Sequence, residues 1–453
     1  MLKRIAQYAA TILAMLLLLA GCTTQPPVSL TAIVFGNSAE VATLAVERAG
    51  GRVTHDLHLI KAVGATITDD QLSTLAADDA LARVVVAEST PENSKYRPTP
   101  DAEITTWLQQ SLSRPEVNNA LQSHLDSVAP TLTGRGIGIA LIDTGLSPWA
   151  THLSGSAIDH HSFNALTNTQ GDVEDITGHG THLASLILGF GTHFRGVAPD
   201  AKIIAVKAFN QEDSASTLDI IRAVQWVVDN KANHNIRVLN LSISALTDLP
   251  YYLDPMNMAL TRAWNEGLVV VVSAGNEGPK ASSITAPGNN PWLITVGAAD
   301  YSDDSLWSSV APFSGRGPTA TGHIKPDVIV PGTLLAGVRA AGSRRPAAEP
   351  DHRNPDGFWI TSGASQASAV ASGLIALLLE ARPSLSNHDV KCILANSASP
   401  LVTYTDEQVS PFAQGRGLLD LAAALASDAT DCPERLEGID PTVPLKGAFS
   451  SEE

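Results

Sequence analysis

Residues 359–378 read WITSGASQASAVASGLIALL, and this stretch decides the fold. Gly363 permits a tight approach of the chain, and Ser365 lies where the sequence turns helical. The apolar residues that follow recur at helical spacing: Val370, Leu374, Leu377 and Leu378. A serine at a helix start commonly acts as an N-cap, because its oxygen accepts a hydrogen bond from a free backbone N–H. Chemistry at Ser365 therefore requires partners elsewhere in the chain.

Two candidate partners precede this stretch. The apolar run IALI, residues 139–142, is followed by Asp143 and a turn glycine. This is typical of a buried parallel strand that presents an acid at its carboxyl end. Further along, DITGHGTH, residues 175–182, places a glycine on each side of His179, which leaves the imidazole uncrowded. The chain thus carries an acid, a histidine and a serine in that order.

These segments resemble the subtilisin family of serine peptidases, in which Asp, His and Ser follow one another in this order. A further match is independent of these three residues. LVVVVSAGNEG, residues 268–278, is an apolar strand followed by Gly275 and Asn276, and it is similar to the family's oxyanion-hole segment. Other similar segments lie at matching places: residues 196–199, 238–242, 326–328 and 415–420. The resemblance extends from about Asn118 to Asp428.

The resemblance implies a Ser-His-Asp triad that acts on proteins or peptides. Ser365 is the expected nucleophile, His179 the base that takes its proton, and Asp143 the acid that fixes the imidazole tautomer. The side chain of Asn276 and the backbone N–H of Ser365 are expected to hold the oxyanion. The residues that the resemblance implies for substrate binding are Ser214, Ala215, Ser242, Ser244 and Gly275.

The stretch around the nucleophile also departs from the family. Members usually have Thr before the serine, Met after it and Pro four residues on, whereas this chain has Ala364, Gln366 and Ala369. Ala364 removes a hydroxyl that could assist the oxyanion site, and Ala369 removes a rigid turn. We expect these departures to affect the rate of the reaction more than its identity.

Two other classes of function stay open at this point. A non-catalytic binding protein could keep the same scaffold, although it would have no physical need for the complete triad and the asparagine. A metal hydrolase could use Asp175, His179 and His182, but no convincing further ligand is present. The subtilisin resemblance implies no required cofactor. Structural calcium is familiar in the family, yet no loop here matches a calcium pattern closely enough to name ligands.

Strand-like and helical patterns alternate over residues 104–428, the expected peptidase domain. This alternation predicts an α/β fold, a parallel doubly wound sheet of the subtilisin type with its site at the carboxyl edge. The expected strands are residues 202–208, 238–243, 269–273 and 292–298, and the expected helices are residues 104–125, 218–229 and 256–266. Residues 339–357, rich in Arg, Pro and Asp, are expected to form a solvated loop, with an insertion near the cleft as one interpretation.

Residues 30–89 predict strand, helix, strand, helix and strand, at 30–35, 38–49, 57–67, 69–77 and 82–87. This order resembles the small α+β, ferredoxin-like inhibitory propeptide of subtilisins, of the inhibitor I9 type. Such a propeptide would inhibit its own enzyme intramolecularly. Residues 90–103 are polar and contain three prolines, as expected for a cleavable linker. The alternative is a permanent accessory domain.

The first 22 residues predict export. Lys3 and Arg4 precede an apolar run, residues 9–20, that is too short to span a bilayer. LAGC, residues 19–22, resembles the lipobox of bacterial lipoproteins, with Cys22 as the lipidated residue and residues 23–29 as a tether. Thr23, in place of Asp, suggests the outer membrane of a Gram-negative-type envelope. An ordinary secretory signal is the alternative.

The composition of the 453-residue chain restricts its partners. Acidic residues exceed basic ones by 46 to 29, and no basic stripe is present, so we expect no nucleic-acid partner. Export would place Cys392 and Cys432 where disulfides persist. A bridge between them would tie the polar tail, residues 429–453, to the domain, whereas two free cysteines are the alternative.

Overall fold

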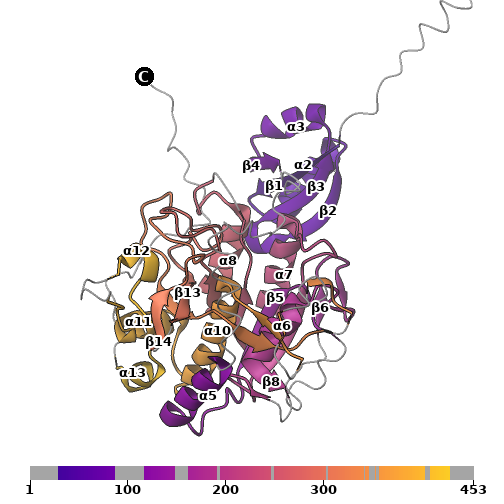
Figure 1. The fold of residues 1–453 in the computed structure, drawn as a ribbon. Coiled ribbons are helices and arrows are strands. Elements are labelled where there is room, and N and C mark those ends of the chain that lie inside the picture. The colour runs from indigo at the N-terminus through magenta and orange to yellow at the C-terminus, as the bar shows by residue number, and fades with distance from the viewer. Residues whose placement is uncertain are drawn as a thin grey trace, which may run out of the picture.

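The computed structural model describes residues 29–86, 117–147, 162–190, 194–245, 249–302, 305–340, 342–345, 352–353, 357–402 and 409–428. Within these ranges the chain forms a small N-terminal domain and a larger domain built on a nine-stranded sheet (Figure 1). Cys22, the expected linker and the polar tail lie outside the described residues.

The large sheet has the strand order β14-β13-β12-β11-β5-β10-β6-β7, and β15 also pairs with β13. Its strands are β5 (Gly138–Asp143), β6 (Phe163–Asn164), β7 (Thr169–Gln170), β10 (Lys202–Lys207), β11 (Ile236–Leu241), β12 (Val269–Ser273), β13 (Ile294–Ser302), β14 (Ser305–Val310) and β15 (Val328–Pro331). Only β14 and β7 run antiparallel to their partners. The sheet therefore has a parallel centre with antiparallel edges.

The direction of winding reverses at β5. The chain passes from β5 through α6 (His179–Leu188) to β10 on one side of β5, and then through α7 (Thr217–Asn230) to β11 on the other. Because such crossovers are right-handed, the reversal places the two helices on opposite faces of the sheet. Ligands of doubly wound sheets bind at the carboxyl ends of the strands at such a reversal. Asp143 lies at that end of β5.

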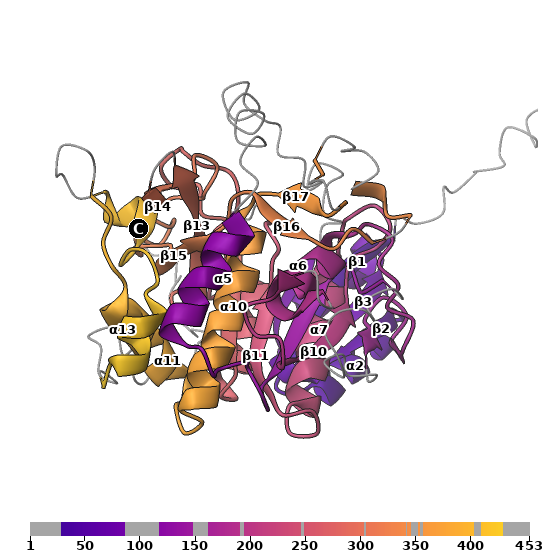
Figure 2. The ribbon, with the colours of Figure 1, turned by 60° about the horizontal axis from the view of Figure 1, so that its bottom comes forward.

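Two helix layers enclose the sheet. α7 packs against α8 (Pro255–Asn265) toward the N-terminal domain, and α6 packs against α10 (Ala364–Ala381) on the other side (Figures 1 and 2). α10 has the length and apolarity of a membrane span, but 89% of that window is buried inside the protein, so it is the core helix. The remaining elements are α5 (Val117–Val128), β8 (Gly189–Phe190), β9 (Phe194–Arg195), β16 (Leu335–Gly337), β17 (Trp359–Thr361), α11 (Asn387–Ser397), α12 (Pro411–Gln414) and α13 (Leu421–Ala426).

The predicted doubly wound α/β fold is confirmed, with small shifts at element ends. β12 has the predicted bounds, while β11 begins two residues before the predicted run at Val238. α7 begins after Ser216, whose hydroxyl accepts the N–H of Asp219, and α8 begins after Asp254, whose carboxylate accepts the N–H of Asn257. These caps lie two residues before the predicted helices, because the capping residue need not be apolar.

The N-terminal domain has one strand more than the sequence predicted. Its elements are β1 (Leu30–Gly36), α2 (Ala39–Arg48), β2 (Arg52–Leu57), the 3-10 turn η1 (His58–Ile60), β3 (Ala62–Ile67), α3 (Asp69–Ala76) and β4 (Leu81–Val86), in the sheet order β2-β3-β1-β4. The prediction of one extended segment over residues 57–67 was wrong. Lys61 has a left-handed backbone (φ 57°), so the chain turns and β2 pairs with β3 as a hairpin.

The N-terminal domain packs on α7 and α8. Phe35 and Leu57 belong to the same buried apolar cluster as Leu218 of α7. Hydrogen bonds also cross the boundary: Gln225 Oε1 accepts the N–H of Leu59 (3.0 Å), and Gln225 Nε2 donates to the carbonyl of Asp56 (3.2 Å). The domain is thus joined to the peptidase-like domain by both apolar and polar contacts.

Two further predictions concern the edges of the large domain. The helix predicted over residues 104–125 is described only as α5, which continues three residues beyond Leu125, and residues 104–116 lie outside the described residues. Cys392, buried in α11, is disulfide-bonded. Cys432 lies outside the described residues, so its pairing with Cys392 stays a prediction.

Candidate active site

Asp143 and His179 are in direct contact. The Nδ1 atom of His179 lies 2.8 Å from Oδ1 and 3.0 Å from Oδ2 of Asp143. Asp143, only 2% exposed, also accepts the N–H of Thr144 (2.8 Å). Burial opposes ionisation of this carboxyl most strongly. The attraction of His179, the two hydrogen bonds and the charge of Arg345 together outweigh burial, and the pKa of Asp143 is lowered. The acid is thus held as a carboxylate against the imidazole.

Asp175 fixes the segment that delivers His179. Its carboxylate accepts six hydrogen bonds, from the side chain of Thr144, from both the backbone and the hydroxyl of Thr177 and of Thr181, and from the N–H of Gly178. Thr144 in turn contacts Asp143. The carboxylate therefore joins the start of α6 to the end of β5.

The two glycines that flank His179 meet different needs. Gly178 has φ of 99°, the left-handed region that favours glycine. At Gly180 a Cβ atom would lie 2.3 Å from the carbonyl oxygen of Gly145 and 3.1 Å from Asp143 Oδ1. Any side chain at position 180 would therefore push α6 away from β5. The two glycines therefore do more than leave the imidazole uncrowded. They also allow His179 to lie close to Asp143.

Ser365 is the second residue of α10 and is 4% exposed. Gly363 is the N-cap, so Ser365 does not cap the helix. Gly363 is held in place because its N–H donates to the carbonyl of Gly332 (2.8 Å). A Cβ on Gly363 would lie 2.4 Å from Oε1 of Gln366, the residue that departs from the family pattern. The N–H of Ser365 is in the first helical turn, where the helix itself supplies no acceptor.

Asn276 lies beside the start of α10. Its Oδ1 atom accepts the N–H of Ala364 (2.8 Å), and its Nδ2 atom lies 3.6 Å from where a Cβ on Gly363 would be. The asparagine amide and the first turn of α10 are thus adjacent, as expected if both act on one oxyanion.

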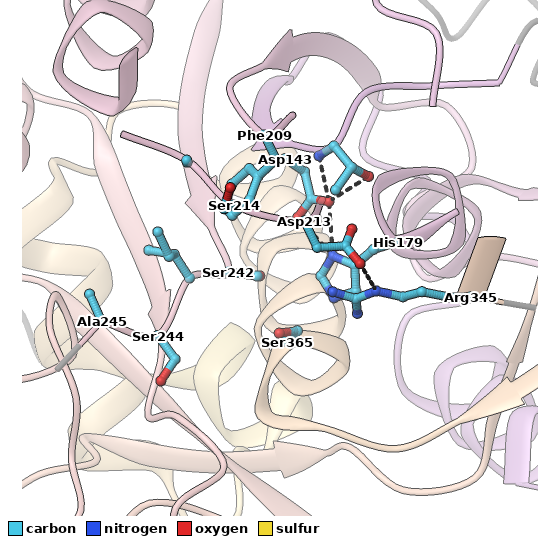
Figure 3. A pocket seen from close by; sticks show the side chains of 13 residues that line it. Asp143, His179, Phe209, Asp213, Ser214, Ser242, Ser244, Ala245, Arg345 and Ser365 are labelled. Carbon is cyan, nitrogen blue, oxygen red and sulfur yellow. Dashed lines mark hydrogen bonds and ion pairs between the residues drawn. The ribbon is translucent and has the colours of Figure 1, made fainter. Parts of the chain in front are cut away.

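One pocket brings the triad candidates together (Figure 3). Its lining includes Asp143, His179 and Ser365 from three separate segments. Four of the five residues expected to bind substrate also line it: Ser214, Ala215, Ser242 and Ser244. Gly275 is not among the lining residues and lies against Thr285 and Ser244.

Three of these four residues are engaged within the protein, since the hydroxyl of Ser244 donates to Oγ1 of Thr285 (2.9 Å). The N–H and carbonyl of Ser214 are both bonded to Asn210, so they are not available for pairing with an extended peptide. The hydroxyl of Ser242 bonds to Asn240 and Ser368 in the core. This leaves Ala215 as the better candidate at the first edge, because alternate residues of an extended segment face a pairing partner.

The three residues of the metal-hydrolase alternative do not converge. Asp175 is occupied by N–H and O–H donors, His179 faces Asp143, and Nε2 of His182 faces the carbonyls of Leu335 and Trp359. In the part of the chain that the structure describes, no group of three or more His, Cys, Asp or Glu side chains could hold a metal ion. Calcium ligands accordingly stay unassigned.

Comparison with known proteins places this geometry in a family. The model of the subtilase family matches residues 134–417, more than half of the chain. The chain belongs to the subtilase family. The residues described above are therefore those of a subtilase, and the resemblance inferred from the sequence is confirmed at the level of the family.

Curated relatives agree with this assignment. The chain is 36% identical over 279 residues to serine protease AprX of Bacillus subtilis, covering 59% of this chain and 62% of the relative. It is 30% identical over 278 residues to subtilisin of a Bacillus species, covering 58% of this chain and 61% of that relative. The matched region thus spans about three-fifths of the length of these relatives.

Solved structures share the fold. Fervidolysin of Fervidobacterium pennivorans, described as a keratinolytic enzyme related to subtilisin, superposes with a TM-score of 0.67 at 20% identity, over 90% of this chain and 62% of its own. A psychrophilic protease, S41, superposes with a TM-score of 0.55 at 26% identity, over 66% of this chain and 97% of its own. The match to fervidolysin, at 20% identity, shows that this subtilase shares its fold and no more.

Sequence reasoning missed several residues near the site. Phe209 and Arg345 line the pocket, and Nζ of buried Lys207 donates to the carbonyls of Thr144 (2.6 Å) and Glu174 (2.8 Å). Burial lowers the pKa of Lys207, and nearby carboxylates, Asp175 first, partly oppose this. A lysine that ends an apolar strand was a usable signal. An insertion near the cleft was one interpretation of the loop that carries Arg345, but no local signal singled out Arg345 within it.

Proposed function

We propose that the protein is a serine endopeptidase that hydrolyses peptide bonds in protein or peptide substrates. The observation that supports this most is the pocket in which Ser365 joins His179, already paired with Asp143. In this proposal His179 takes the proton of Ser365 as the hydroxyl attacks the carbonyl, and returns it to the leaving amine. Asp143 holds Nδ1 protonated, so that Nε2 is the basic nitrogen.

Ser365→Ala tests the activity. Hydrolysis of a peptide library should be lost while the circular dichroism spectrum is retained, because only the nucleophilic oxygen is removed. A fluorophosphonate probe should label the unaltered protein and not the variant. Turnover by folded, protease-free Ser365→Ala protein would refute the assignment, and inhibition by a chelator without labelling would favour the metal-hydrolase alternative.

We further propose that residues 30–89 are an inhibitory propeptide. The packing of the N-terminal domain on α7 and α8 supports this, since it places the domain beside the peptidase-like unit through buried contacts such as Leu57 and Gln225. Self-cleavage would fall between Thr90 and Asp101, and tethering would make the scissile bond effectively concentrated at Ser365. N-terminal sequencing of the unaltered chain and of Ser365→Ala tests this. A processed Ser365→Ala chain would mean that another protease makes the cut.

Lipid anchoring through Cys22 is a separate proposal, supported by the basic start at Lys3 and Arg4, the apolar run of residues 9–20 and the LAGC motif. It implies a partner membrane, the outer membrane of a Gram-negative-type envelope, and release of the catalytic domain if the propeptide is cut and dissociates. Cys22→Ala should abolish incorporation of labelled fatty acid, because the thiol is the acylation point. Label that still enters the variant chain would refute the lipobox.

A further inference from the structure

Arg345 reaches the catalytic pocket from a segment that is anchored beside His179. The backbone N–H groups of Arg344 and Arg345 donate to the carbonyls of Ile176 (3.0 Å) and Thr177 (3.1 Å). These carbonyls belong to the segment that leads into α6. The side chain of Arg345 lines the same pocket as His179 and points toward Asp213 (Figure 3).

Asp213 forms an ion pair with Arg345 from another wall of the pocket. Its Oδ2 atom accepts Nε of Arg345 at 2.9 Å and lies 3.6 Å from Nη2 of Arg344. The side chains of Arg345 and Asp213 are 22% and 14% exposed, so both charges are partly desolvated. Asp213 has φ of 60°, in a turn that Asn210 holds from inside. The ion pair therefore bridges two rigidly held segments over the pocket.

The bridge lines the same pocket as the expected base and nucleophile. Asp213 and Arg345 share the pocket with His179, and Ala215, the candidate for pairing with substrate backbone, is two residues from Asp213. The lining also includes the apolar residues Phe209 and Ala215 and the uncharged polar residues Thr144 and Ser214. A side chain in this subsite would meet uncharged groups beside an ion pair whose two charges oppose each other.

We propose that Asp213 and Arg345 form a charge-neutral bridge that determines specificity, so that the subsite beside His179 takes uncharged side chains on the acyl side of the scissile bond. This rests on the proposed peptidase function. An uncompensated charge in a partly desolvated pocket attracts a substrate residue of opposite sign and repels one of like sign. Pairing the two charges cancels both effects, so the subsite favours binding of neither acidic nor basic substrate side chains.

The proposal predicts opposite outcomes for the two halves of the bridge. Arg345→Gln leaves Asp213 with the weaker, mostly exposed Arg344, so the subsite becomes more negative and should favour Lys and Arg. Asp213→Asn leaves two arginines without their carboxylate, so the subsite should favour Asp and Glu. Asn suits this position because it tolerates a left-handed backbone. The double variant should again prefer uncharged residues.

Peptides with Lys, Glu or Gln at each acyl-side position test this with the full chain. We expect the Lys-to-Glu ratio of kcat/KM at one position to rise about 3- to 30-fold in Arg345→Gln and to fall by a similar factor in Asp213→Asn. Raising the salt concentration should shrink both shifts. Arg195→Gln removes a partner of the surface residue Asp126 (2.9 Å) and should leave the ratio unchanged.

Binding of the same peptides to these variants in a Ser365→Ala chain separates this proposal from the proposed function. Opposite shifts in binding preference support the bridge even if hydrolysis proves to depend on another residue. Shifts of the same sign in both variants, or no shift in either kcat/KM or binding, would overturn it.

Discussion

The side-chain oxygen of Asn276 accepts a hydrogen bond from the backbone N–H of Ala364, at 2.8 Å. Because a backbone N–H requires an acceptor, this contact fixes which end of the amide is oxygen and leaves Nδ2 as the donor. Ala364 directly precedes Ser365, so the asparagine is tied to the turn that carries the expected nucleophile. The donor and the nucleophile therefore keep their spacing.

Substitution of Asn276 should slow the chemical step. Asn276→Ala removes the Nδ2 donor, and we expect kcat to fall roughly 10²–10³-fold with little change in KM, the size known for loss of this role in subtilisin. Asn276→Asp keeps an acceptor for the N–H of Ala364 but adds negative charge near the oxyanion, so its kcat should fall at least as far. Steady-state kinetics measures both. An unchanged kcat in Asn276→Asp would remove Nδ2 from the mechanism.

Asp175 should act as a positioning residue. Asp175→Asn replaces one carboxylate oxygen by a donor that faces other donors, so the start of α6 should shift relative to Asp143. We expect kcat/KM to fall roughly 10- to 100-fold, mainly through kcat. Asp389→Asn is the matched control, since Asp389 also bonds to backbone at a helix start, in α11 and at the surface. Equal losses of activity in both variants would mean a general loss of stability.

Asp327 should make stability depend on pH. Its carboxylate, 11% exposed, accepts hydrogen bonds from Nζ of Lys325 (2.6 Å) and from the N–H of Thr295 (2.7 Å), and it lies 3.3 Å from Nζ of Lys391. Burial, the largest effect, opposes ionisation, but the two lysines and the hydrogen bonds outweigh it, and the pKa of Asp327 is lowered. Its stabilisation is therefore complete above the pKa of an unfolded aspartate, about 4, and is lost as pH falls through the lowered value.

The measurement is urea unfolding between pH 3 and 7. It uses the Ser365→Ala chain, which lacks the proposed nucleophile and so should not digest itself. Asp327→Asn should lower the free energy of unfolding by about 3–5 kcal/mol at pH 7, since it leaves buried lysine charge uncompensated. As the pH falls, the free energy of unfolding of this variant should decrease less than that of the chain with Asp327. Asp126→Asn, at the surface, should change stability by less than about 1 kcal/mol. An unaltered acid profile in Asp327→Asn would contradict the prediction.

Gln225 should control how firmly the N-terminal domain is held. Gln225→Ala removes the bonds to the N–H of Leu59 and to the carbonyl of Asp56, so the amide of Leu59 should exchange faster with solvent. Hydrogen exchange on the Ser365→Ala chain measures this. Gln122→Ala, which loses only a bond to Asp126 on the surface, should leave the Leu59 amide unchanged. Equal exchange in all three chains would show that the remaining contacts across the boundary, and not Gln225, protect the Leu59 amide.

Much of the fold followed from local pattern. β12 is buried along its whole length, so its apolar run coincides with the strand, whereas β11 begins at Ile236, before the run that was recognised. The N-terminal hairpin was missed because a single non-glycine residue, Lys61, makes the turn. A left-handed lysine leaves no signal in composition, unlike the glycines that bound α6.

The site was predictable where chemistry lies in short motifs and not where it depends on distant contacts. Asp143, His179 and Asn276 follow strands or turn glycines that mark them. Arg345 was expected to be part of a solvated loop, yet it reaches Asp213, 132 residues earlier in the chain. The internal bonds of Ser214 and Ser242 likewise depend on tertiary partners, so their sequence neighbours could not reveal them.

The burial of α10 has a consequence for the timing of synthesis. Asp143 and His179 are made long before Ser365, and the helix that carries Ser365 packs against β11, β12, β13 and α6, which precede it. A growing chain therefore possesses the expected base and its acid but lacks the expected nucleophile until residue 365 has been made. In this order, the last member of the expected triad arrives only after every strand of the large sheet has been synthesised.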